Sequence, residues 1–504
     1  MRKKSIFSST ILITTAVLFS KILGVLKKSL IAAICGVSLD TDIYFISTSF
    51  MMLLGSMFFS SLSISFLSMY TQRLLNEGRD SANNLINAVL WVFLPASLGI
   101  TLIFMIAAPV VARIIAPYYS GEALQELTTF IRLLSIMFVF ICYFLLLNVI
   151  PETDKRFLPG KGYGFFQNLL SCVAVILFYP KYGIVSLIYA FLLAGFLQCL
   201  QITWSARHQF RFLLLSVKQE KKAIKQLMIL ALPLFIGNAI YEINDIVDKQ
   251  IASGLGSGGV SVLSYGASIN EMVTTLIISS ISTVMFAYYA SWISDNDITK
   301  VKMNFLKSIR YLFILILPIM IMCFVCGDII VDIVFNHGRF DNAAGIATTH
   351  VIYGYAAGFL FQAFRSIIIR VYYAFQDTRT PMFNGIVAVS INIILSFVLS
   401  RYFNEAGIAF ATSISMLVVS LLLLPKLKKH IPDLSLKPIL PDCLKGIVIA
   451  ALTGVVVVFV RNTICFNPII EFLLIGCVLV IVYVALGFML HISAINELKR
   501  IFRN

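Results

Sequence analysis

The sequence predicts an all-α protein that crosses a membrane many times, and three observations lead to that fold class. First, 59% of the 504 residues are hydrophobic and only 12% are charged, whereas a soluble protein of this length carries about twice that share of charge. Second, the apolar residues form runs of about 20, the length that a helix needs to cross the hydrocarbon core of a bilayer. Third, no ten-residue alternation typical of a membrane β-barrel is present.

About fourteen such runs can be counted. The first follows the basic segment Met1–Lys4 and resembles a secretion signal, but no small-residue cleavage site follows promptly, so we expect an uncleaved first helix. The predicted spans are 8–35, 41–70, 85–115, 124–150, 162–180, 183–205, 226–252, 260–292, 308–335, 346–375, 380–402, 406–425, 443–461 and 467–491.

The basic residues predict the orientation of these spans. With the N-terminus on the inner side, the inner loops and both termini hold 27 lysines and arginines, the outer loops hold 5 and the spans hold 7. Basic loops stay in the cytoplasm, so both termini are expected there. Because the net charge of +15 is scattered over short loops, nucleic acid is not an expected partner.

An ordered set of matches indicates two homologous halves. Four positions recur in the same order with offsets of 222 to 224 residues: Asp154, Pro159, Asn168 and Gly183, then Asp377, Pro381, Asn392 and Gly407. We therefore expect two six-helix lobes in a parallel pseudo-twofold repeat, as in transporters that place their substrate between two halves. The predicted bounds are 1–206 for the N-lobe, 207–225 for a linker, 226–430 for the C-lobe and 431–504 for two added helices with a cytoplasmic tail.

The linker, residues 207–225, combines bulky apolar side chains with basic ones. This pattern predicts an amphipathic helix that lies on the inner leaflet. An ordinary solvated linker is the alternative.

The first span carries Lys21, Lys27 and Lys28 among apolar residues. Charged side chains at membrane depth are costly and usually face a water-filled cavity or a partner. At 100° per residue, Lys21 and Lys28 fall on one helix face with Gly24 between them. Snorkelling to an interface would explain one such lysine but explains poorly three of them over two turns. We favour a polar cavity lined by basic groups.

The seventh span contains a second charged group, formed by Glu242, Asp245, Asp248 and Lys249. A local ion pair within one helical turn would make this group structural. The functional alternative is a cation or proton site that loads and unloads during transport, and the sequence leaves both open. Further charges at membrane depth are Glu271, Arg365 and Arg370.

An enzyme is not expected. Asp40 and Asp42 lie in the first outer loop, where membrane glycosyltransferases place a catalytic acid, but the outer loops are too short to fold into a site. Asp42 could instead cap the second span. No metalloprotease, hydrolase or P-loop motif is present. The pair Cys323 and Cys326 lies inside an apolar run and is predicted to be small core residues.

Several longer stretches resemble the lipid II flippase family (MurJ or MviN), part of the multidrug/oligosaccharidyl-lipid/polysaccharide exporter superfamily. The resemblance covers essentially the whole chain, and fourteen helices is also the number in that family. The matching stretches are 20–44 (KILGxxKxSLIAAxxGxSxxTDxYF), 245–253, 261–265, 335–341 and 373–381.

The resemblance implies a flippase that moves a polyprenyl-diphosphate-linked sugar, with lipid II of peptidoglycan synthesis as the expected substrate, to the outer leaflet of a bacterial plasma membrane by alternating access. In the family, basic cavity residues hold the diphosphate, which assigns that role to Lys21, Lys27 and Lys28. Lys21 and Lys27 stand at family arginines, and Lys28 replaces an acid. The other cavity residues implied are Asp42, at a family acid, and Ser268, Glu271 and Arg365. Gly55 and Ser56 stand where the family has arginines in span 2, and Ser268 stands at an arginine of span 8.

A sodium site described for the family would fall on Asp245 or Asp248, Asn392 and Thr412, with Ser396 at one acidic position. A sodium ion or the membrane potential is therefore the expected driving force, with no other metal or cofactor. Spans 13 and 14 would form the groove for the lipid tail. We expect a monomer that contacts its lipid-linked substrate and membrane lipids, with cell-wall synthases as protein partners.

Three alternatives remain open. A flippase of the same fold could carry a capsule or exopolysaccharide repeat unit. A drug/cation antiporter of the same superfamily would be expected to have acids in the first-lobe cavity, where this chain has lysines. A scaffold without transport activity would make the intramembrane charges dispensable.

Overall fold

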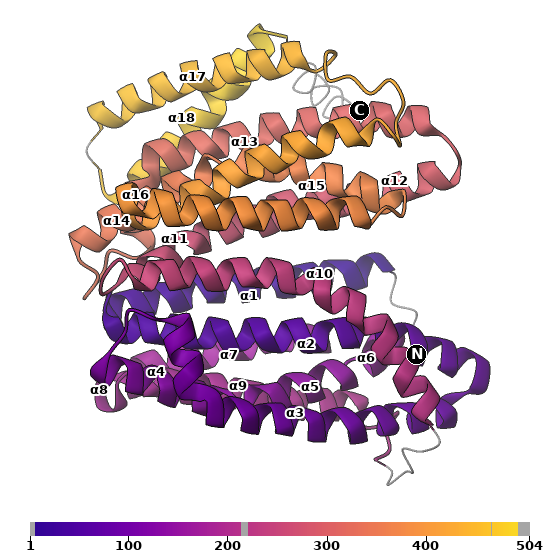
Figure 1. The fold of residues 1–504 in the computed structure, drawn as a ribbon. Coiled ribbons are helices and arrows are strands. Elements are labelled where there is room, and N and C mark those ends of the chain that lie inside the picture. Colours follow the sequence, from indigo (N-terminus) through magenta and orange to yellow (C-terminus); the bar gives the residue numbers. More distant parts are fainter. Residues whose placement is uncertain (1–5, 213–219, 465, 492–504) are drawn as a thin grey trace. The chain divides into compact units, whose positions relative to one another are not determined.

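The computed structural model describes residues 6–212, 220–464 and 466–491, and within them every regular element is a helix (Figure 1). The internal contacts divide the chain into two compact units. The first unit is Met1–Ser261 together with Gly338–Phe340, and the second is Val262–His337 together with Asp341–Asn504.

The first unit is a bundle of apolar helices. Its elements are α1 (Ile6–Cys35), α2 (Leu39–Glu77), α3 (Arg79–Ile115), α4 (Gly121–Leu134), α5 (Met137–Leu147), α6 (Val149–Thr153), η1 (Pro159–Lys161), α7 (Gly162–Val173), the π-helical η2 (Ala174–Phe178), α8 (Tyr179–Tyr182), α9 (Val185–Ala206) and α10 (Lys221–Ser253). The helix α2 packs against α3, α4, α5 and α10. Its N-terminus is fixed by a capping box between Ser38 and Thr41, which satisfies backbone donors at the first turn.

The second unit continues with α11 (Gly259–Val273), whose first turn still belongs to the first unit. The remaining elements are the π-helical η4 (Thr274–Ile278), α12 (Ser279–Ser294), α13 (Ile298–Val334), α14 (Asn342–Ala356), α15 (Phe359–Ala374), α16 (Arg379–Leu427), α17 (Leu440–Thr463) and α18 (Pro468–Met489). Helices α17 and α18 pack on α13 (Figure 1) around a cluster of buried apolar side chains that includes Leu317, Ile449 and Leu479.

The all-α membrane fold is confirmed. Ten helices among the described residues are long and apolar enough to cross a membrane, or eleven when α14 and α15, bent by 41°, are one span. The 49-residue α16 joins two helices across a break at Asn404, where φ is 50°. The predicted count of fourteen is compatible with these helices and stays a prediction.

The cysteine pair of α13 lies in the core. Cys323 is 3% exposed and Cys326 is fully buried, and both are free thiols. Cys326 also marks a break in α13, with φ −119° and ψ 20°. The prediction of small core residues is confirmed for this pair.

The repeat in the sequence predicts a C-lobe that begins at residue 226. The contacts in the structure group α10 with the first unit, where it packs along α2. Of the predicted linker helix, Phe210–Phe212 are not helical and Lys221 already begins α10, while 213–219 lie outside the described residues. The backbone of Arg211 is held by Asn83 and Asn87 of α3 at 2.8 to 3.1 Å.

Candidate functional site

The three lysines of α1 lie on the opposite side of the helix from its exposed apolar residues. Leu18, Ile22 and Leu26 are exposed, whereas Lys21, Lys27 and Lys28 are half-buried. At 100° per residue, the lysines point away from the stripe formed by those apolar side chains. The exposed apolar and the half-buried basic side chains of α1 thus lie on different sides of the helix, and the polar cavity expected for the lysines stays a prediction.

The lysine face is also the face by which α1 contacts α7. Asn168 of α7 donates from Nδ2 to the Ser20 carbonyl at 2.9 Å. A Cβ atom added to Gly24 would lie 3.3 Å from the same amide nitrogen, so the glycine permits this close approach. Because Lys21 and Lys28 flank Gly24 on the helix surface, both side chains leave α1 on the side that packs against α7.

Asp42 is buried in the first unit, and its carboxylate accepts three hydrogen bonds. A fourth hydrogen bond joins two of its neighbours. The backbone N–H groups of Gly258 and Ser261 donate to it at 2.6 and 2.7 Å, and the Ser261 hydroxyl donates at 2.5 Å. The fourth bond joins the hydroxyls of Ser261 and Thr41 at 2.9 Å. The carboxylate thus satisfies N–H groups at the first turn of α11, which is the role of an N-cap supplied from another helix.

Two of the three acids of α10 are engaged within that helix. Asp245 forms an ion pair with Lys249 one turn on, and Asp248, which is 7% exposed, accepts a hydrogen bond from Asn244 at 3.1 Å. The third acid, Glu242, accepts from Ser56 of α2 at 3.5 Å. The ion pair within one helical turn, which was the structural alternative to a cation site, is therefore present.

The second unit holds the remaining predicted cavity residues. Ser268 is buried and donates to the Tyr265 carbonyl at 2.5 Å. Arg365 of α15 is 9% exposed, and its Nε donates to Asn384 Oδ1 of α16 at 3.3 Å. Glu271 is exposed, although it lies within a membrane-spanning segment.

Two members of the predicted cation site come together across the break in α16. Asn392 Nδ2 lies 3.0 Å from Thr412 Oγ1, and Ser396 donates to Asn392 Oδ1 at 3.3 Å. These residues belong to the second unit, whereas Asp245 and Asp248 belong to the first. The four-residue cation site therefore stays a prediction. Among the described residues, no group of three His, Cys, Asp or Glu side chains could hold a metal ion.

The sequence interpretation missed one polar network of the second unit. Thr274 Oγ1 donates to Gln362 Oε1 at 2.9 Å, and Gln362 Nε2 lies 3.4 Å from Asn270 Oδ1. The i,i+4 spacing of Asn270 and Thr274 in a hydroxyl-rich span was a visible signal. The sequence carried no signal for the π-helical turn that begins at Thr274.

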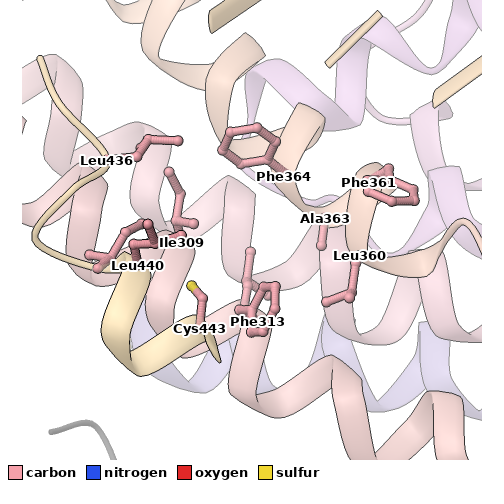
Figure 2. Close-up of a pocket in the computed structure, with 11 residues that line it drawn as sticks. Ile309, Phe313, Leu360, Phe361, Ala363, Phe364, Leu436, Leu440 and Cys443 are labelled. Carbon is pink, nitrogen blue, oxygen red and sulfur yellow. The ribbon is translucent and has the colours of Figure 1, made fainter. Parts of the chain in front are cut away.

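An apolar pocket of about 180 Å³ opens on the second unit between α13, α15 and α17 (Figure 2). Figure 2 shows Phe313, Leu360 and Cys443 around it. The lining includes residues of α17 and none of α18, so the predicted tail groove between the last two spans stays a prediction. The residues that line it are Ile309, Leu312, Phe313, Leu360, Phe361, Ala363, Phe364, Leu436, Ile439, Leu440 and Cys443.

Comparisons with known proteins agree on one family. The model of the lipid II flippase MurJ family matches residues 31–477. A probable lipid II flippase MurJ of Rhizobium tropici is 25% identical over 429 residues, covering 82% of this chain and 79% of the relative. A second, from Thermotoga maritima, is 23% identical over 460 residues, covering 89% of this chain and 91% of the relative.

Solved structures show the same fold. A lipid II flippase MurJ in an inward closed conformation superposes with a TM-score of 0.82 at 24% identity, covering 96% of this chain and all of the other. An inward-facing multidrug transporter of the MATE family superposes with a TM-score of 0.71 at 13% identity, covering 82% and 95%. The helical architecture is therefore shared beyond the family whose model matches.

Proposed function

The chain belongs to the lipid II flippase (MurJ) family, and from this premise we propose that it moves the peptidoglycan precursor lipid II from the inner to the outer leaflet by alternating access. The observation that carries the proposal is the half-buried face of α1 that holds Lys21, Lys27 and Lys28. Its amines would bind the diphosphate of the lipid, because charge-assisted bonds to phosphate oxygens are among the strongest hydrogen bonds in proteins.

The charge of the diphosphate explains why lysines are placed within a membrane helix. A diphosphate cannot enter hydrocarbon unaided, since an unpaired charge there is strongly disfavoured. Three lysines within two turns of α1 offer a polar path, and lysine binds phosphate as a mobile point charge. The polyprenyl tail can remain in the lipid, where apolar surfaces such as the pocket beside α17 are available to it.

The finer parts of the proposal rest on the sequence and the family. We place the protein in a bacterial plasma membrane with both termini in the cytoplasm, from the bias of basic loops. We propose that it works as a monomer without enzymatic activity, driven by a sodium ion or the membrane potential, and that cell-wall synthases are its protein partners.

A second candidate is a flippase for another glycan-lipid. Gly55 and Ser56 of α2 stand at positions of family arginines, and Ser56 contacts Glu242. A changed cavity of this kind would keep a diphosphate site and fit a different sugar.

Depletion of the protein in its host separates the two candidates. The lipid-linked precursors on the inner leaflet are extracted and identified by mass spectrometry. Accumulation of lipid II with cell lysis supports the proposed function. Viable cells that accumulate a different glycan-lipid would move the assignment to polysaccharide export.

A further inference from the structure

The loop between α13 and α14 ends in a tip that packs with the first unit. Both helices lie in the second unit, but the tip of their loop, Gly338–Phe340, is grouped with the first. The Arg339 N–H group donates to the Ala33 carbonyl near the C-terminal end of α1 at 2.8 Å, where helix carbonyls lack a partner within the helix. Because Phe340 is also buried, with 3% exposed, the tip is docked on the first unit.

Two glycines allow this close approach. A Cβ atom added to Gly338 would lie 2.2 Å from the Ala33 carbonyl oxygen, and one added to Gly36 would lie 2.9 Å from the Arg339 carbonyl oxygen. Both glycines have a positive φ, 62° at Gly338 and 74° at Gly36, which side chains disfavour. Since a backbone carbonyl cannot rotate away as a side chain can, a side chain at Gly338 would displace the tip from α1.

The tip is anchored to the second unit on both sides. Before it, Asn336 donates from Nδ2 to Asp332 of α13 at 2.8 Å. After it, Asp341 caps α14 by accepting from the Ala344 N–H group at 2.7 Å. Only residues 337–340 lie between these anchors, and a chain extends by at most about 3.6 Å per residue. A large movement of the anchors relative to α1 must therefore pull the tip off α1.

The contact involves two loops that the basic residues assign to the outer side. The loop from α1 to α2 carries no lysine or arginine, and Arg339 is the single basic residue of the loop from α13 to α14. In alternating access, the side facing the product compartment stays closed during loading and opens for release. A contact that binds the two halves of the chain together on this side has to break in each cycle.

We propose that the tip Gly338–Phe340 is a latch, which keeps the outer side closed while it is docked on α1 and which releases when the transporter opens outward. This inference rests on the proposed function and goes beyond it, because it names a contact that the transport cycle makes and breaks. The glycines at positions 36 and 338 serve the latch by letting the two backbones meet.

The first test locks the latch. A Cβ atom at Gly36 would lie 3.2 Å from the Cβ atom of Arg339, close to the separation of about 3.5–4.5 Å in a disulfide, so Gly36→Cys with Arg339→Cys should cross-link on oxidation. Cys35 is replaced by alanine throughout, because it neighbours the new thiol. In proteoliposomes, oxidation should lower lipid II transport by at least about tenfold, and a reductant should restore it. Each single-cysteine variant is the control and should not respond to oxidation.

The second test weakens the docking. Gly338→Ala places a Cβ atom against the Ala33 carbonyl, whereas Gly183→Ala introduces a side chain at the same φ of 62° where no atom lies within 4 Å. Both variants thus carry the same backbone strain, and only the first disturbs the contact with α1. Combined with the cysteine pair, Gly338→Ala should slow cross-linking by about fivefold or more, while Gly183→Ala leaves the rate within about twofold.

Complete cross-linking without loss of transport would overturn the inference. A pair that does not cross-link, or a cross-linking rate that both alanine variants lower equally, would show that the tip does not dock through Gly338, and would overturn it as well. A wild-type protein that moves no lipid II would instead contradict the proposed function.

Discussion

Arg310 of α13 and Asp442 of α17 form an ion pair of 2.9 Å, and the polarity of this pair is reversed further along the same two helices. There, Asp328 of α13 binds Arg461 of α17. The partners on each helix are 18 or 19 residues apart, which corresponds to about 27 Å of helix, close to the thickness of a hydrocarbon core. Between them lies the apolar cluster of α13, α17 and α18. The two pairs therefore fix the register of α17 on α13.

The first prediction concerns this register. Both side chains of the Arg310–Asp442 pair are largely buried, with 17% and 10% exposed. Removal of one partner leaves the other buried and uncompensated, so Arg310→Ala should destabilise the second unit by on the order of 3 kcal/mol. The measurement is thermal unfolding of the purified protein in detergent.

Charge exchange provides the control for that prediction. Arg310→Asp alone should be at least as damaging as Arg310→Ala, because it places two acids together. The double variant Arg310→Asp with Asp442→Arg restores a pair of opposite charges and should recover most of the loss. A double variant no more stable than the single one would show that the pair does not set the register.

The second prediction concerns the diphosphate site. Lys27→Ala with Lys28→Ala should lower lipid II transport by more than about a hundredfold, since each lysine would supply charge-assisted bonds to phosphate. Transport is measured in proteoliposomes, and insertion is checked by membrane fractionation. Lys222→Ala with Lys225→Ala removes the same charge from exposed positions at the start of α10 and should transport normally. Full activity of the α1 variant would contradict the proposal that these lysines bind the diphosphate.

The third prediction separates the capping role of Asp42 from a merely polar one. Asp42→Asn replaces one of the two accepting oxygens by an amide donor, which then opposes the N–H group of either Gly258 or Ser261, so it should cost about 2 kcal/mol of unfolding free energy. Ser261→Ala removes only one hydroxyl donor and should cost about 1 kcal/mol. Asp40→Asn, the same change at an exposed position two residues earlier, should be neutral. The order of the three melting temperatures is the readout, and equal values for Asp42→Asn and Asp40→Asn would rule out the cap.

The sequence carries much of the fold and less of the site. Hydropathy predicts the membrane helices, and the helical spacing of Lys21 and Lys28 predicts the half-buried basic face. The Asp245–Lys249 pair is local, so its i,i+4 spacing was sufficient. The partner of Asp42 lies more than 200 residues away at Ser261, and no local pattern reveals such a contact. The predicted spans 380–402 and 406–425 end on either side of the break at Asn404, so the sequence located that break, whereas the break at Cys326 lies inside the predicted span 308–335 and was not predicted.

The last prediction concerns pH. Asp377, in the loop between α15 and α16, lies 3.1 Å from the Nε2 atom of His430, whose ring stacks on Phe375 at 4.8 Å. Burial, the largest influence, raises the pKa of the Asp377 carboxyl, but hydrogen bonds from Thr380 and His430 together outweigh it, so the pKa is lowered from 3.8. A carboxyl with a lowered pKa in the folded state stabilises the protein above its unfolded pKa, and this contribution is lost as the pH falls through the folded value.

The wild-type protein should therefore melt a few degrees above Asp377→Asn at pH 7, and the difference should disappear as the pH falls below about 4. Melting curves of both proteins in detergent between pH 7 and pH 3 measure it. Asp297→Asn is the matched comparison, because the pKa of that carboxyl is also lowered but its partner is Lys300, at 2.8 Å, and not a histidine. A difference between wild type and Asp377→Asn that persists unchanged at pH 3 would mean that the ionised carboxylate does not hold His430, and that the contact depends on packing against Phe375 alone.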